Sequence, residues 1–141
     1  MKTLLILLFL FSNAVLAERQ PATVVRVIDG DTIKISAPWV PAPLKPEISI
    51  RVSGVDTPEH AGIAQCDLEA QRADKATEFT QGLITHAKKI EVTYTQWDKY
   101  GGRILGEVWV DDKALSEQLI AAHLARAYHG EKKQGWCHGQ D

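Results

Sequence analysis

The chain has 141 residues, of which 45% are hydrophobic and 24% are charged, and its formal net charge at pH 7 is −2. This length and composition fit one folded domain with a single core and argue against a chain of several domains. The slightly acidic balance excludes a protein that binds polyanions through its overall charge, so any contact with nucleic acid would need a local basic patch.

The N-terminus has the pattern of an export signal. A lysine precedes an unbroken apolar run over residues 4–11, and Val15 and Ala17 fit the residues that a signal peptidase accepts before its cleavage point. The run has about eight residues, whereas a bilayer crossing needs roughly 20; a buried first strand or an uncleaved anchor are the alternatives. We expect residues 1–17 to be a signal peptide and residues 18–141 to form one exported domain, in the periplasm or outside the cell. Removing the leader takes away one lysine and no acid, which lowers the net charge from −2 to −3.

Strand patterns come next in the chain. Over residues 22–35, apolar and polar residues alternate on both sides of Asp29-Gly30-Asp31, which predicts a β-hairpin with an Asp-Gly turn. Four prolines between residues 38 and 46 then prevent ladder pairing and indicate an extended surface loop. A third strand is predicted over residues 48–55, before Pro58 ends it.

The second half of the chain predicts two helices and two strands. Over residues 64–89, apolar side chains recur every three or four residues, which predicts an amphipathic helix facing the core with Ala73, Ala76, Phe79, Leu83 and Ala87. Strands at 90–95 and 103–110 flank a glycine-rich turn, and a second helix is predicted at 115–125. This order fits a small five-stranded OB-fold β-barrel with two to three helices, in the mainly β or α+β class. A two-layer α+β sheet is the competing interpretation.

Acidic residues cluster at two of the predicted turns. Asp29 and Asp31 lie at the first hairpin, while Asp56 and Glu59 follow the third strand. Neighbouring strand ends converge in a barrel, and gathered carboxylates are stable only beside a cation or basic groups. Oxygen-only ligands favour a hard cation such as Ca²⁺ or Mg²⁺ over zinc. Taken alone, however, an Asp-Gly-Asp sequence is more commonly only a turn.

Two arginines make this acidic pattern more informative. Arg51 lies on the polar face of the third predicted strand, and Arg103 begins a later one. Guanidinium groups and a metal ion can stabilise the charge that grows on phosphorus during phosphodiester cleavage, and a carboxylate can orient or deprotonate water. Viewed singly, each arginine could instead form only a surface salt bridge.

Three sequence blocks in this order resemble the signature blocks of the staphylococcal nuclease (thermonuclease) family. They are VIDGDTI at 27–33, IRVSGVDTPE at 50–59 and DKYGGRILG at 98–106. The resemblance extends loosely from about Val24 to about Tyr128. It implies an OB-fold and a Ca²⁺-dependent phosphodiesterase that acts on DNA and RNA, cleaving the 5′ P–O bond to leave 3′-phosphate ends.

The resemblance also implies a role for each matched residue. The calcium ion, or another hard divalent cation, would be held by two carboxylates and one backbone carbonyl, those of Asp31, Asp56 and Thr57. Arg51 and Arg103 would bind the scissile phosphate, and Glu59 would lie near the attacking water. The nucleotide pocket would be lined by Lys99, Tyr100 and Tyr128. By the same comparison, Asp29 would be a turn residue rather than a metal ligand.

The sequence departs from the family pattern before Arg103, where two glycines replace the usual one. If the extra glycine is absorbed as a bulge, Arg103 still points inward; otherwise its side chain changes face. A second feature is the pair Cys66 and Cys137, which in an exported protein predicts a disulfide, with two free thiols as the alternative. We expect such a bridge to take over the anchoring role of the extra C-terminal helix that the best-known member of the family has.

The resemblance implies DNA and RNA as substrates. We also expect no membrane contact after signal cleavage, no protein partner and a monomeric state. A non-catalytic OB-fold module that binds nucleic acid is the main alternative. Such a module would lose its acids or arginines first, whereas this chain keeps them. A calcium-stabilised structural protein is a third reading, which leaves both arginines unexplained.

Overall fold

The computed structural model describes residues 17–139, so the predicted signal peptide lies outside the described residues except for Ala17. Two helices are present in this part, α1 (Asp67–His86) and α2 (Leu115–Ala121). The long strands are β2 (Val24–Asp29), β3 (Thr32–Ser36), β4 (Glu47–Val52), β6 (Ile90–Trp97) and β7 (Arg103–Val110). The two-residue strands are β1 (Gln20–Pro21), β5 (Val55–Asp56), β8 (Lys113–Ala114) and β9 (Arg126–Ala127).

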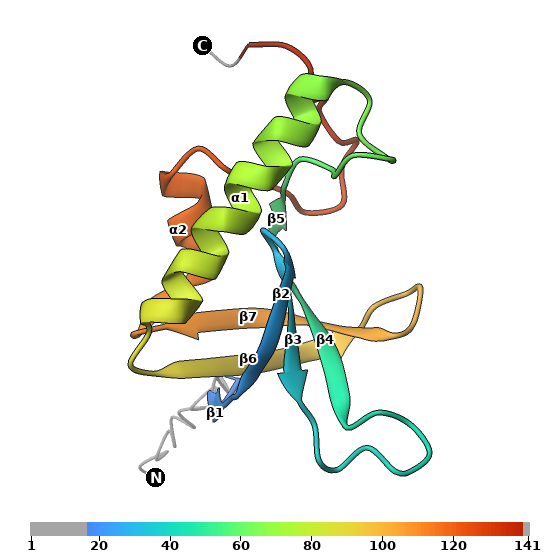
Figure 1. Cartoon of the computed structure of the whole chain (residues 1–141), viewed down its shortest axis with the longest axis vertical. Coiled ribbons are helices and arrows are strands. Elements are labelled where there is room, and N and C mark those ends of the chain that lie inside the picture. Colours follow the sequence, from blue (N-terminus) through green and yellow to red (C-terminus); the bar gives the residue numbers. More distant parts are fainter. Residues whose placement is uncertain (1–16, 140–141) are drawn as a thin grey trace, which may run out of the picture.

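The main sheet has the strand order β1-β6-β7-β4-β3-β2, with β8 paired to β7. All neighbours are antiparallel except β4 and β7, which run parallel. The first and last strands of this path are joined by only two residues. Ala22 donates to the carbonyl of Ile90 at 3.0 Å, and Thr23 accepts from Ser36 at 2.9 Å. Ala22 and Thr23 therefore connect the two ends of the strand path, and the sheet curves around the core (Figure 1).

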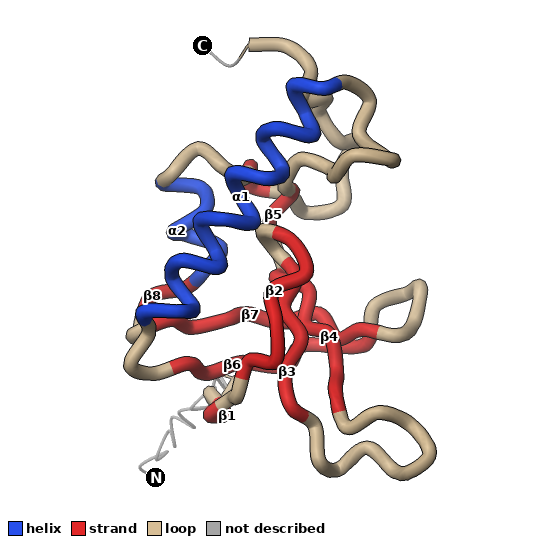
Figure 2. The backbone as a smooth tube through the Cα atoms, viewed as in Figure 1, coloured by secondary structure: helices blue, strands red, loops and turns tan. Residues whose placement is uncertain are grey.

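This architecture confirms the predicted OB-fold-like α+β class. Residues 17–139 form five long strands and two helices, and both helices lie toward one end of the strongly curved sheet, with the proline loop toward the other (Figure 2). The core is made of alternating strand residues and of leucines from α2, including Ile33, Ile50, Val108, Leu115 and Leu119. No helix within residues 17–139 is long and apolar enough to cross a bilayer.

The first helix is shorter than the predicted 64–89, and turns interrupt two other predicted elements. The strand predicted at 48–55 is divided, because Gly54 adopts a left-handed conformation (φ 77°) and β5 leaves the main sheet to pair with β9. The helix predicted at 115–125 ends at Ala121, because His123 is left-handed (φ 57°) and the amide of Leu124 bonds back to the carbonyl of Leu119. In both cases a turn occurs at a point where the apolar pattern of the sequence continues.

Helix α1 packs directly on the turn between β2 and β3. A Cβ atom added to Gly30 would lie 2.7 Å from the Cβ of Ala76, so this contact requires glycine. The hydroxyl of Thr80 donates to the carbonyl of Gly30 at 2.6 Å. The helix thereby fixes the position of the turn that carries Asp31.

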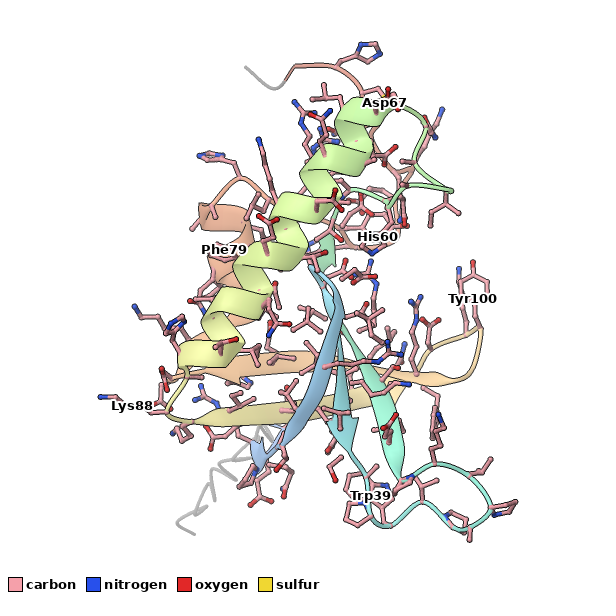
Figure 3. All side chains as sticks on the ribbon, viewed as in Figure 1. Trp39, His60, Asp67, Phe79, Lys88 and Tyr100 are labelled. Atoms are coloured by element: carbon pink, nitrogen blue, oxygen red, sulfur yellow. A yellow bond between two sulfur atoms is a disulfide. The ribbon has the colours of Figure 1, made fainter. Side chains whose placement is uncertain are left out.

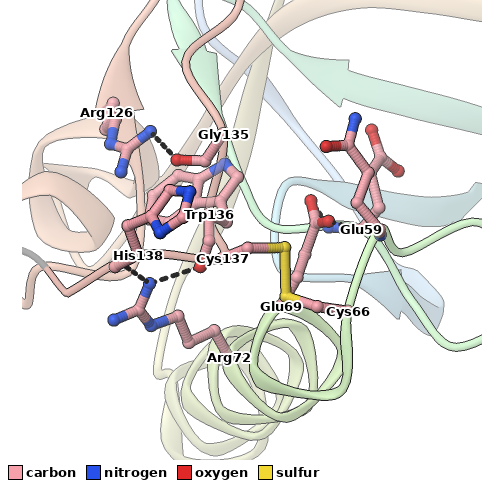
Figure 4. Close-up of a disulfide and its surroundings, with 10 residues drawn as sticks. Glu59, Cys66, Glu69, Arg72, Arg126, Gly135, Trp136, Cys137 and His138 are labelled. Atoms are coloured by element: carbon pink, nitrogen blue, oxygen red, sulfur yellow. Dashed lines mark hydrogen bonds between the residues drawn. A yellow bond between two sulfur atoms is a disulfide. The ribbon is translucent and has the colours of Figure 1, made fainter.

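The C-terminal segment returns to the first turn of α1. A disulfide joins Cys66 and Cys137, whose Cα atoms are 5.9 Å apart, and this confirms the predicted bridge (Figure 4). Arg72 of α1 donates to the carbonyls of Trp136 and His138. Residues 128–139, which we call the C-terminal tail, are therefore held against α1.

Candidate active site

Asp31 lies in the turn between β2 and β3 and is only 3% exposed. Its Oδ1 accepts a hydrogen bond from the hydroxyl of Thr32 at 3.0 Å, and its Oδ2 accepts one from the hydroxyl of Thr57 at 2.7 Å. Asp29 accepts the backbone N–H of Asp31 at 3.3 Å, as expected of a turn residue. The Thr57 contact joins two segments that lie 26 positions apart in the sequence.

Arg51 reaches the same carboxylate from β4. Its Cα is paired with that of Thr32, so its side chain starts one position away from Asp31 across the sheet. One guanidinium nitrogen contacts Oδ2 of Asp31, and the other donates to the carbonyl of Val55 at 3.4 Å. The side chain is mostly buried and faces the cluster rather than bulk solvent.

The charges around Arg51 show which predicted groups have gathered near it. Burial is the largest influence and lowers the pKa of its guanidinium, and the positive charge of Arg103 lowers it further. The negative charges of Asp29, Asp56 and Glu59 act in the opposite direction. Arg51 therefore lies within electrostatic range of the predicted catalytic and metal-binding groups.

Asp56 and Glu59 lie at the exit of β5. Asp56 is 4% exposed, accepts the indole N–H of Trp136 at 3.1 Å, and has its Oδ1 2.7 Å from the ammonium of Lys133. The side chain of Glu59 is 44% exposed, and its Oε1 lies 3.4 Å from the same ammonium. Its backbone N–H donates to the buried carboxylate of Glu69 at 3.2 Å, which fixes the start of the following loop.

Lys133 forms ion pairs with both Asp56 and Glu59. Partial burial disfavours its charge, but the hydrogen bonds and charges of Asp56 and Glu59 outweigh that effect and raise the pKa of Lys133 above its ordinary value. Its ammonium is thus charged at neutral pH.

Arg103 lies on the same side as Arg51 despite the additional glycine. Gly101 and Gly102 are both left-handed (φ 70° and 74°) and belong to the turn, so β7 begins with Arg103 itself. The guanidinium of Arg103 contacts the buried carboxylate of Asp98, whose pKa is lowered chiefly by that hydrogen bond. The extra glycine is therefore accommodated in the turn.

A cleft of about 670 Å³ gathers cationic and aromatic residues of the site, whereas the acids Asp31, Asp56 and Glu59 do not line it. Its lining includes two arginines and all three residues predicted for the nucleotide pocket, together with a second lysine: Arg51, Arg103, Lys99, Tyr100, Tyr128 and Lys133. Figure 3 shows Tyr100 at the tip of the β6–β7 turn, pointing away from the sheet. A separate cavity of about 350 Å³ is lined by Asp56, Thr57, Glu59 and the C-terminal tail.

Comparison with known protein families assigns this chain to one of them. Residues 49–138 match the family model described as staphylococcal nuclease homologue. The chain belongs to the staphylococcal nuclease family.

Individual relatives agree with the family match. A protein named thermonuclease from Staphylococcus hyicus is 34% identical over 113 residues, which cover 79% of this chain and 61% of the relative. A protein named uncharacterized endonuclease from Escherichia coli is 33% identical over 124 residues, covering 87% of this chain and 71% of the relative. A protein of the same name from Escherichia coli O157:H7 is 32% identical over 124 residues.

The residues at the predicted metal position suit a hard cation. Within residues 17–139, no three His, Cys, Asp or Glu side chains are grouped as a metal site. The site expected in a nuclease of this family would need only two carboxylates, and a backbone carbonyl and water would complete it. Asp31 and Asp56 would supply buried oxygen ligands, and each already lies against a cationic side chain, Arg51 or Lys133. These carboxylates therefore require positive charge, as a metal site does.

The sequence did not point to two groups that support the site. Glu69 accepts hydrogen bonds from the backbone N–H groups of Glu59 and Gln65. Its position in phase with the apolar face of α1 is the sequence feature that could have identified it. Lys133 is the second supporting group and lies in the polar, glycine-rich tail. Its contact with Asp56 has no local signal, because the disulfide and the tail bring it there from 77 positions away.

Proposed function

We propose that this chain is an exported nuclease that hydrolyses phosphodiester bonds of DNA and RNA in a Ca²⁺-dependent reaction. The supporting observation is the position of Arg51. It is largely buried, contacts Asp31, lines the cleft with Arg103, and lies within electrostatic range of Asp56 and Glu59. In a member of the staphylococcal nuclease family, this combination matches the chemistry of phosphodiester cleavage.

The chain's own residues divide into three tasks. Asp31, Asp56 and the carbonyl of Thr57 would hold the cation, which when bound supplies positive charge beside the phosphate oxygens. Arg51 and Arg103 would bind the phosphate and stabilise the charge that develops on its oxygens. Arg51 is oriented by Asp31 and the carbonyl of Val55, and Arg103 by Asp98.

Glu59 is suited to handle the attacking water. It is 44% exposed, while the hydrogen bond from its backbone to Glu69 keeps the segment in place. A carboxylate so placed can orient a water molecule and accept its proton. The leaving group would be the 5′ oxygen, with a 3′-phosphate product, as the family resemblance implies. Tyr100 and Tyr128, which line the cleft, would stack on bases.

The test is an assay of residues 18–141 with single-stranded DNA, duplex DNA and RNA, first with Ca²⁺ and then with a chelator. We expect cleavage that the chelator abolishes. Glu59→Gln and Arg51→Ala should each lower turnover by at least about 100-fold. The exposed residues Glu78 and Arg26 provide matched controls, since Glu78→Gln and Arg26→Ala remove the same charges outside the cleft. Nucleic-acid binding without cleavage would instead support a non-catalytic OB-fold module, and near wild-type rates in Glu59→Gln or Arg51→Ala would refute the assigned roles.

Export is proposed from the N-terminal pattern, and the Cys66–Cys137 disulfide is in keeping with an oxidising compartment. N-terminal sequencing of the protein recovered from a bacterial host should find a chain that begins at Glu18. A chain that keeps its first 17 residues in the cell interior would contradict this part of the proposal.

A further inference from the structure

The ammonium of Lys133 lies across the two acids to which the proposed function gives the cation and the water. It is 2.7 Å from Oδ1 of Asp56 and 3.4 Å from Oε1 of Glu59. Asp56 is almost completely buried, so this ammonium places a positive charge beside an oxygen that has little access to solvent. A divalent cation bound to Asp56 would meet Lys133 at the same carboxylate.

The backbone that follows Lys133 is anchored to helix α1. Four residues further on, Cys137 is covalently joined to Cys66 beside the first turn of α1. Arg72, one turn into that helix, donates to the carbonyl of Trp136 and at 2.9 Å to that of His138 (Figure 4). The tail is thus attached to α1 at Trp136, Cys137 and His138, shortly after Lys133.

The side chain of Trp136 adds a third attachment. It is 3% exposed, its N–H donates to Oδ2 of Asp56 at 3.1 Å, and the guanidinium of Arg126 stacks 3.9 Å from its ring centre. The tail therefore contacts both oxygens of the Asp56 carboxylate, one through an indole N–H and the other through an ammonium.

We propose that Lys133 is a tethered competitor of the divalent cation. Its ammonium occupies the Asp56–Glu59 pair in this structure and must withdraw before a cation can use Asp56. This inference rests on the proposed metal dependence. A group attached to the same chain acts at a high effective concentration, and metal affinity falls in proportion to the fraction of molecules in which the site is open.

The structure provides space for the withdrawal. The Lys133 side chain is 47% exposed, and it lines both the cavity beside Glu59 and the larger cleft that contains Arg51 and Arg103. A flexible four-carbon stem can therefore move the ammonium from one to the other while the backbone stays attached.

The decisive measurement is the dissociation constant for Ca²⁺, obtained by isothermal titration calorimetry on residues 18–141. If Lys133 occupies the pair nine-tenths of the time, Lys133→Met should bind Ca²⁺ about tenfold more tightly than the wild type. Lys132→Met is the matched control. It removes the same charge from the adjacent residue, which lines the same cavity, and it should change the constant by less than about twofold because exposed charges are screened. Equal affinities in the wild type and Lys133→Met would overturn the proposal.

The disulfide supplies a second test. The variant Cys66→Ser/Cys137→Ser should bind Ca²⁺ more tightly than the wild type, because the tail no longer holds Lys133 at the acids. In a Lys133→Met background, the same cysteine changes should leave the affinity unaltered, since coupled groups are not additive. An equal gain in both backgrounds would show that the tail acts without Lys133 and would overturn the inference.

These outcomes are distinguishable from failure of the proposed function. If the wild type and Lys133→Met bind Ca²⁺ equally, only the inference about Lys133 fails. If neither protein binds Ca²⁺ and chelator does not affect cleavage, the proposed metal dependence fails, and the inference fails with it.

Discussion

Replacing Gly30 by alanine tests whether α1 positions the catalytic turn. Gly30 precedes Asp31, and its backbone is not left-handed, so any residue could adopt its conformation. Space is what it lacks, because an added Cβ would lie 2.7 Å from the Cβ of Ala76 and 3.2 Å from its carbonyl carbon. Both atoms belong to Ala76 in a packed helix, so neither can rotate away from the added Cβ.

The expected cost follows from these distances. Carbon atoms in contact prefer a separation of about 3.5–4.0 Å, so the turn and the helix must move apart by roughly 1 Å. Overpacking of this kind costs about 1–3 kcal/mol of unfolding free energy. Because Asp31 would move with the turn, we also expect turnover to fall by about 100-fold, the usual scale for a misplacement of this size.

Urea denaturation and a nuclease assay check both effects. Gly82→Ala is the control, since an added Cβ at this α1 residue meets nothing within 4 Å, and removing a mid-helix glycine should stabilise the protein by up to about 1 kcal/mol. Ala76→Gly should partly rescue Gly30→Ala, so that the double variant is more stable than the sum of the single changes predicts. Wild-type stability of Gly30→Ala, or strictly additive effects, would refute the steric argument.

Two further predictions concern buried carboxylates. Glu69→Gln should cost about 1–3 kcal/mol of unfolding free energy and lower kcat, because each carboxylate oxygen accepts a different N–H, that of Glu59 or Gln65, and Gln replaces one oxygen with an NH2 donor. An unchanged urea midpoint and kcat would contradict this. The Arg103 hydrogen bond holds the pKa of Asp98 below its ordinary value, so its stabilising effect is present above about pH 4 and is lost as the pH falls through the lowered pKa. Asp98→Asn should therefore lower the melting temperature at pH 7 and make it fall less steeply below pH 4, whereas parallel curves for the two proteins would argue against this role.

The sequence predicted much of this fold because its strands alternate regularly and its turns carry glycine. The three family blocks also located the acids and arginines that the fold brings together. The division of the third strand at Gly54 was not predicted, since β5 is drawn away by pairing with β9, a contact between residues about 70 positions apart. Lys133 was missed for the same reason: its environment depends on the disulfide and on long-range packing.

Helix α1 shows what a stricter reading of periodicity would have found. Its buried residues are Glu69, Ala73, Ala76 and Thr80, spaced by four, three and four positions. A search for apolar residues finds the two alanines and passes over the polar members of the same face. Each polar member bonds a different loop of the site, Glu69 the segment at Glu59 and Thr80 the turn at Gly30.

This arrangement makes α1 a common reference for the parts of the site. The Asp31 turn, the Glu59 loop and the C-terminal tail are separate in sequence, yet all three contact one helix, through Ala76 and Thr80, Glu69, and Arg72, respectively. Because packed elements transmit strain, a displacement of α1 would move all three together. A polar residue in phase with the buried stripe of such a helix is therefore better interpreted as a positioning contact than as a break in amphipathicity.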